Sequence, residues 1–68
     1  MAVLTYKQGE ALRAVRRAPG GSTKRLAAIA GLTLRQIAQG LYALQQLGVI
    51  RREPNKGIDR WWPQEDRL

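Results

Sequence analysis

Hydrophobic residues recur at helical spacing in three stretches of the chain. The first stretch runs over about residues 6–18, with a group of arginines opposite its apolar side. Its apolar positions are Ala11, Leu12, Val15 and Ala18. Thr5 precedes the stretch and Gln8 follows three residues later, which is the spacing of a capping box. We therefore predict a first helix over residues 6–18, ended by the turn residues Pro19 and Gly20.

The second stretch is shorter and predicts a helix over about residues 23–30. Ser22 and Thr23 are both favourable N-cap residues, so the helix begins after one of them. Its apolar side is formed by Leu26, Ile29 and Ala30. Gly31 follows directly, where a helix often ends in a left-handed conformation that suits a residue without a β-carbon.

The third stretch predicts a helix over about residues 33–47, which Gly48 ends. Thr33 and Gln36 repeat the capping-box spacing at its start. Its apolar positions are Leu34, Ile37, Leu41 and Leu44. Gly40 lies inside this helix, where glycine costs about 1 kcal/mol relative to alanine and favours bending or fraying. Gly40 either permits a close approach by a neighbouring element or is only tolerated, and the sequence leaves both interpretations open.

The last third of the chain changes character and predicts a β-hairpin. Two runs rich in β-branched and aromatic residues, 49–53 and 58–62, flank a turn signal. The turn signal is Pro54-Asn55-Lys56-Gly57. If the turn is centred on Asn55 and Lys56, Arg52 lies opposite Asp59, a favourable pair of opposite charges. A register shifted by two residues remains an alternative.

The hairpin also marks the predicted end of the domain. Pro63 follows the second strand and ends it. We therefore expect a single domain over residues 1–63 and a flexible tail over residues 64–68. The adjacent pair Trp61 and Trp62 projects to opposite faces of its strand, so we expect one tryptophan in the core and the other exposed.

Composition excludes several classes of function. The 68 residues carry 12 Lys+Arg, 5 Asp+Glu, a net charge of +7, and neither Cys nor His. A chain of this length forms one small domain with a thin core. Without Cys or His there is no thiolate nucleophile, no Ser-His-Asp triad and no common zinc or haem ligand set. We therefore expect no enzyme, no catalytic residue, no metal and no cofactor.

The charge favours a polyanionic partner, and it is unevenly distributed. Seven basic residues and one acidic residue lie from Lys7 to Arg35. Five basic residues and four acidic residues lie from Arg51 to Arg67. Nucleic acid and an anionic membrane both fit a basic protein. A membrane role fits less well, because no helix combines a basic face with large aromatic residues. We see no signal peptide or membrane span and expect a cytoplasmic, nucleoid-associated protein.

The arrangement of these elements resembles the winged helix-turn-helix superfamily. The resemblance runs from about Tyr6 to Trp62, and its most specific part is the join from Leu44 through Gly48 to Arg52. A small residue, Ala27, lies four positions before the turn glycine, where two crossing helices approach closely. The resemblance implies a mainly α fold, with three helices and a wing formed by the hairpin. The helical Gly40, the short wing and the tryptophan pair depart from the usual pattern.

The resemblance also implies how the protein would bind DNA. Helix 33–47 would enter the major groove and present Arg35, Gln36 and Gln39 to base edges. A second group of residues would contact the sugar-phosphate backbone. These residues lie at helix N-termini, further along the third helix and in the wing. This group consists of Ser22, Thr23, Lys24, Thr33, Tyr42, Gln46, Arg51, Arg52, Lys56 and Arg60. Trp61 and Trp62 are the candidates for a protein contact.

We therefore expect a small sequence-specific regulator that binds double-stranded DNA. Its size implies a partner, such as a second copy or another protein, because one such module buries only about 600–1,000 Å² on DNA. We expect no site for a small-molecule effector. Two alternatives remain open: a winged helix that binds another protein, and a sequence-tolerant nucleic-acid binder in replication, recombination or packaging.

Overall fold

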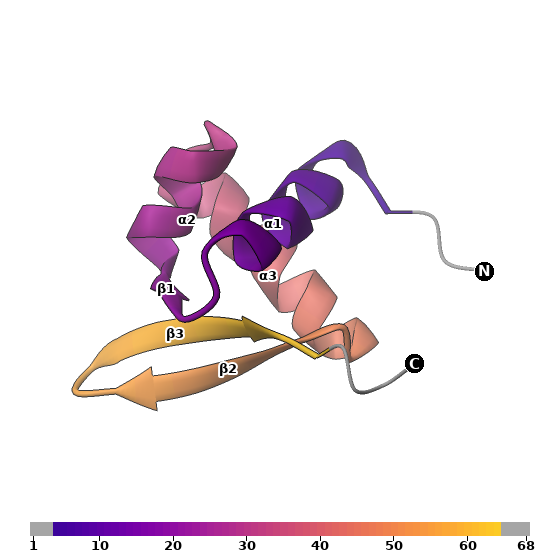
Figure 1. Cartoon of the computed structure of the whole chain (residues 1–68). Coiled ribbons are helices and arrows are strands. Elements are labelled where there is room, and N and C mark those ends of the chain that lie inside the picture. Colours follow the sequence, from indigo (N-terminus) through magenta and orange to yellow (C-terminus); the bar gives the residue numbers. More distant parts are fainter. Residues whose placement is uncertain (1–3, 65–68) are drawn as a thin grey trace.

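The computed structural model describes residues 4–64, and these form three helices packed against a small antiparallel sheet (Figure 1). The elements are α1 (Tyr6–Arg17), β1 (Gly21–Ser22), α2 (Thr23–Ala30), α3 (Leu34–Leu47), β2 (Ile50–Asn55) and β3 (Ile58–Pro63). Figure 1 shows the helices gathered on one side of the β2–β3 hairpin, with α1 crossing in front of α3. The predicted three helices and wing hairpin are confirmed.

The helix ends form as the capping residues predict. Thr5 with Gln8, and Thr33 with Gln36, each make a complete capping box, with hydrogen bonds of 3.1 and 3.2 Å in the first and 3.1 Å in the second. Ser22 is the N-cap of α2, because its hydroxyl accepts the backbone N–H of Arg25 at 3.2 Å. The predicted helix bounds hold to within one residue.

Among residues 4–64, ten apolar residues make up the buried core, and Trp61 has the largest side chain of the ten. They are Ala11, Ala14, Val15, Leu26, Ala27, Ile37, Leu41, Leu44, Ile50 and Trp61. Two predicted core positions are wrong. Leu34 is 55% exposed, because α3 enters the core only from Ile37 onward. Ile29 is 38% exposed, because α2 is rotated so that Leu26 and Ala27 face the core.

Gly40 lies where α1 and α3 touch. A β-carbon at this position would lie 3.1 Å from the β-carbon of Ala11 and 3.1 Å from the backbone oxygen of Lys7. The helix continues through Gly40 from Leu34 to Leu47 without interruption. The close-approach interpretation of Gly40 is therefore confirmed, and the glycine sets the spacing between two helices.

The hairpin forms, but in the alternative register. Only Lys56 and Gly57 form the turn, both with positive φ (54° and 80°), as a two-residue hairpin turn of type I′ requires. Arg52 therefore lies opposite Trp61, and Asp59 lies opposite Pro54. The predicted centre at Asn55 and Lys56 is wrong by one residue, so the cross-strand pairing shifts by two residues and every side chain stays on its predicted face.

The shifted turn also changes the strand bounds. β2 continues to Asn55 and includes Pro54, which is tolerated because β2 is an edge strand in the order β1-β3-β2. Val49 stays outside the strand, because its backbone N–H donates to the oxygen of Leu44 at 3.2 Å and helps to end α3. Arg52 and Asp59 still form an ion pair at 3.8 Å, now across a diagonal.

A third strand, β1, has no counterpart in the sequence prediction. Gly21 and Ser22 pair with Trp61 and Arg60 of β3. The neighbouring Gly20 donates its N–H to the oxygen of Trp61 at 2.8 Å. A two-residue strand has no periodicity to detect, so β1 becomes visible only in the tertiary structure.

The predicted tail begins at Gln64, whose backbone N–H donates to the oxygen of Val49 at 2.9 Å. The rest of the predicted tail, residues 65–68, lies outside the described residues, as do residues 1–3 of the predicted domain.

The contact at Gly40 yields a stability prediction with an internal control. Gly40→Ala should lower the stability by about 1–2 kcal/mol, because the new methyl group meets a backbone oxygen that cannot move aside easily. Gly9→Ala in α1 should instead raise stability by about 0.5–1 kcal/mol, because nothing lies within 4 Å of a β-carbon there. Urea unfolding measures both, and equal gains from the two substitutions would contradict the close packing.

Candidate nucleic-acid interface

One side of α3 carries a polar stripe that faces solvent. Its four residues are spaced by 4, 3 and 4 positions, which places them on one side of the helix. They are Arg35, Gln39, Tyr42 and Gln46, and all four are exposed. The opposite side of α3 is buried through Ile37, Leu41 and Leu44. We call these four residues the α3 stripe; since α1 packs on the buried side, the stripe faces away from α1.

Gln36 does not belong to this stripe. Its side-chain oxygen accepts the backbone N–H of Thr33, and the Thr33 hydroxyl accepts the backbone N–H of Gln36. The side chain is half-buried against the start of the helix. Of the three residues predicted to contact bases, the structure therefore brings Arg35 and Gln39 together and sets Gln36 apart.

Trp61 connects the α3 stripe to the start of α2. Its indole Nε1–H donates to the hydroxyl of Thr23 at 2.9 Å. Its ring also meets the ring of Tyr42 edge-on, with centroids 6.0 Å apart and planes at 75°. The N-terminus of α2 and the middle of α3 therefore lie beside the same buried side chain. The prediction of Trp61 as a protein contact is wrong, because the residue is 1% exposed.

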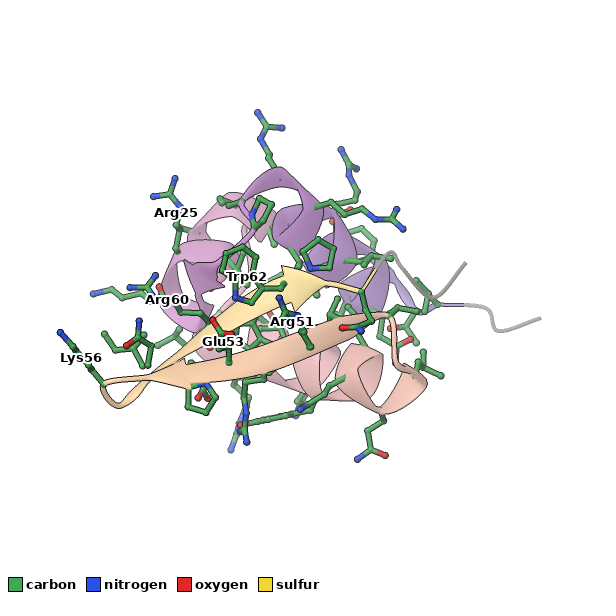
Figure 2. All side chains as sticks on the ribbon, turned by 60° about the horizontal axis from the view of Figure 1, so that its bottom comes forward. Arg25, Arg51, Glu53, Lys56, Arg60 and Trp62 are labelled. Carbon is green, nitrogen blue, oxygen red and sulfur yellow. The ribbon has the colours of Figure 1, made fainter. Side chains whose placement is uncertain are left out.

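The outward face of the hairpin holds two of the predicted wing cations. Figure 2 shows Arg51, Glu53, Arg60 and Trp62 together on this face. The Arg51 guanidinium lies 5.7 Å from the centroid of the Trp62 ring and 3.9 Å from a Glu53 carboxylate oxygen. Arg60 donates to the backbone oxygen of Gly20 at 3.0 Å. These two arginines are held by neighbours within the chain, on a face turned away from the helices.

Arg52 and Lys56 occupy different positions in the wing. Arg52 lies opposite Trp61 in the strand pairing and so shares the face that Trp61 presents to the helices. Since Trp61 contacts Tyr42, Arg52 lies on the side of the α3 stripe. Lys56 is at the exposed tip of the turn (Figure 2). A hollow of about 410 Å³ lies between the start of α2 and the start of β3, and it is lined by Ser22, Thr23, Lys24, Gly57, Ile58 and Asp59.

Within residues 4–64 there is no cluster of three or more acidic, Cys or His side chains that could hold a metal ion. The same part of the chain contains no helix long and apolar enough to cross a membrane.

No protein-family model matches the chain, and no curated protein matches its sequence. Solved structures do match. A MarR family transcription regulator superimposes with a TM-score of 0.80 and 25% identity, over 88% of this chain and 42% of that one. The PcaV transcriptional regulator of Streptomyces coelicolor, solved with its natural ligand, superimposes with a TM-score of 0.82 and 19% identity, over 94% of this chain and 48% of that one. The chain has the winged helix-turn-helix fold.

A third winged-helix structure matches this one at a similar size. The Zalpha domain of PKZ from Carassius auratus, solved in complex with Z-DNA, superimposes with a TM-score of 0.72 and 18% identity, over 84% of this chain and 90% of that domain. By contrast, the chain spans less than half the length of the two regulators. These similar proteins are two transcription regulators and a domain solved in complex with Z-DNA.

In winged helix-turn-helix proteins the helix at the position of α3 is called the recognition helix. Sequence reasoning missed one residue on α3. Leu34 was expected in the core, but it is exposed beside Arg35 at the start of the recognition helix. An exposed apolar side chain here suits contact with a thymine methyl group. The signal was present in the sequence, because Leu34 directly follows the N-cap residue Thr33, before the helix has reached its packing partners.

The hydrogen bond between Trp61 of β3 and Thr23 of α2 predicts an effect on stability. Thr23→Val keeps the side-chain shape but removes the acceptor of the buried Trp61 N–H, so it should cost about 1–3 kcal/mol. Thr23→Ser keeps the hydroxyl and should cost less than half as much. Thermal unfolding, followed by near-ultraviolet circular dichroism of the tryptophans, compares the two variants. Equal stability of the Val and Ser variants would show that this hydrogen bond contributes little.

Proposed function

We propose that the chain is a small DNA-binding protein that regulates transcription, with the recognition helix in the major groove of double-stranded DNA. The observation that carries this proposal is the α3 stripe: polar side chains line the solvent side of a helix whose other side is the core. Arg35 and Gln39 are of the types that pair with guanine and adenine edges. Major-groove insertion of such a helix is the usual docking mode of helix-turn-helix proteins.

Backbone contacts in this proposal come from the two sides of the stripe. Thr23 and Lys24 at the start of α2 lie on one side, where free N–H groups and the helix dipole favour phosphate. Arg52 and Lys56 of the wing would supply the contacts on the other side. Tyr42 of the stripe contacts the ring of Trp61 edge-on. Phosphates on both sides would fix the register of the helix in the groove.

The other predicted backbone contacts have a weaker basis. Ser22 and Thr33 use their hydroxyls as N-cap acceptors, which leaves each hydroxyl hydrogen for a phosphate. Gln46 belongs to the stripe but lies in the last turns of the recognition helix. Arg51 and Arg60 lie on the outward face of the hairpin, away from the stripe. Arg52 is also paired, with Asp59, but this pair is on the side of the stripe.

The proposal includes a second DNA-binding unit, because one module of this size buries only about 600–1,000 Å² on DNA. A second copy or a protein partner would supply it. The similar PcaV structure holds a natural ligand, and a similar Lactococcus lactis protein, ZitR, is zinc-responsive. For this chain, the lack of an effector site stays a prediction. A cytoplasmic, nucleoid-associated location follows from the proposed function.

The proposal is tested by titrating the full chain with random duplex DNA and with a pool of selected binding sites, at several salt concentrations. Selected sites should bind at least about 10³-fold more tightly, and the affinity should fall steeply with salt. Equal affinity for all duplexes would support a sequence-tolerant binder instead. Tighter binding to a left-handed CG duplex than to the same duplex in B form would support a function like that of the Zalpha complex. No binding at low salt would favour a protein-interaction module.

Two variants sharpen the same titration. Arg35→Ala should relax preference at one base position by about 1–3 kcal/mol. Lys56→Ala should weaken all duplexes alike and reduce the salt slope by about one, since it removes a single phosphate contact. If Arg35→Ala leaves the base preference unchanged, the proposed orientation of the recognition helix is incorrect.

A further inference from the structure

A second basic surface lies between α1 and α2. The two helices enclose an open groove of about 350 Å³. Ala14 of α1 and Ile29 and Ala30 of α2 form its apolar part. Its rim is formed by α1 and is mainly basic, with Arg13, Arg16 and Arg17 beside a single acidic residue, Glu10. We call this the α1–α2 groove. It lies on a different side of the molecule from the α3 stripe, because α1 packs against the buried side of α3.

The groove has a large excess of positive charge. The helix α1 carries Lys7 and three arginines but only one acidic residue, Glu10. The chain then has no acidic residue before Glu53, so α2 cannot balance this charge. Glu10 pairs with Arg13 at 3.5 Å. Arg17 is exposed and forms no ion pair with any described residue.

Fold stability explains only part of this arrangement. Cations in the last turn of a helix interact favourably with its dipole, which accounts for Arg17. Arg13 lies a turn earlier, and its side chain is 78% exposed. Ile29 remains 38% exposed in a protein whose small core would benefit from burying it. An apolar strip with a basic rim is complementary to a partner that is apolar on one side and acidic along its edges.

A phosphate backbone matches the α1–α2 groove less well than a peptide does. Phosphates would satisfy the arginines but would bring no apolar group to Ile29 and Ala30. An amphipathic segment would place its apolar residues on this strip and its carboxylates beside Arg13 and Arg17. The α3 stripe would stay free during this contact, because it belongs to another side of the molecule.

We propose that the α1–α2 groove binds an acidic, amphipathic helical segment of a partner protein. Binding there is compatible with simultaneous binding of DNA at the α3 stripe. The inference concerns a separate surface and does not require the proposed function to hold.

The test uses a fluorescein-labelled synthetic peptide with leucines at helical spacing and glutamates elsewhere. A second peptide with lysine in place of every glutamate is the control for charge. The full-length protein should bind the acidic peptide saturably and should not bind the basic one. In spectra of the ¹⁵N-labelled protein, the largest shifts should fall on Ala14, Arg17, Ile29 and Ala30. Absence of saturable binding, or shifts concentrated elsewhere, would overturn the proposal.

Matched charge reversals separate the groove from the general charge of the protein. Arg13→Glu with Arg17→Glu should weaken peptide binding roughly tenfold, because two attractive pairs become repulsive. Arg52→Glu with Lys56→Glu changes the net charge equally at the wing and should alter peptide binding less than about twofold. Ile29→Ser should weaken binding roughly threefold, because it removes apolar contact area. Circular dichroism confirms that each variant is folded.

DNA titration of the same variants decides between a peptide surface and a second DNA surface. Arg13→Glu with Arg17→Glu should leave duplex affinity within about threefold, because both residues are distant from the α3 stripe. If this variant loses DNA affinity as strongly as the wing variant does, the α1 cations serve DNA and the peptide proposal fails. If both double variants weaken the peptide equally, only long-range charge attracts it, and the groove is not a specific site.

Discussion

The burial of Trp61 is the interaction on which the rest of the structure depends. Its indole ring is in the core, its N–H is bound to Thr23 of α2, and its edge contacts Tyr42 of the recognition helix. Its backbone pairs with Gly21 on one side and Arg52 on the other. A small domain has few large side chains to bury. One residue in the wing strand therefore sets the positions of α2, α3 and the wing relative to one another.

The choice of Trp61 over Trp62 also determines where the charges of the wing lie. Because side chains alternate along a strand, burial of Trp61 places Arg52 on the side of the recognition helix. Trp62, Arg51 and Arg60 then share the outward face, where they form contacts within the chain. Apart from Lys24 and Arg25 of α2, the basic residues of the described part of the chain therefore lie in three groups. One is at the α3 stripe with the wing, one on the outward face of the hairpin, and one along α1. Net charge alone does not distinguish these groups.

The sequence was sufficient for the helices, because capping boxes and apolar spacing are local signals. The existence of the hairpin was also predictable, but its register was not, because both Asn55-Lys56 and Lys56-Gly57 are candidates for the two central residues of the turn. Lys56-Gly57 forms the turn because glycine adopts positive φ readily at its second position. All four residues of the α3 stripe were predicted, whereas Leu34 was misplaced because α3 packs against the core only after its first turn. The separation of Arg51 from Arg52 depended on which tryptophan is buried, and that is a tertiary property.

The account is tested most directly by mapping duplex DNA onto the ¹⁵N-labelled full chain by nuclear magnetic resonance. Addition of a selected duplex should shift the amide signals of Arg35, Gln39 and Tyr42 and the indole Nε1–H signal of Trp61, which couples the two sides of the interface. The signals of Ala14 and Ala30 in the α1–α2 groove should stay in place. Shifts concentrated on α1, with the signals of the α3 stripe and Trp61 unchanged, would contradict the central claim that the recognition helix, held by Trp61, is the DNA-binding surface.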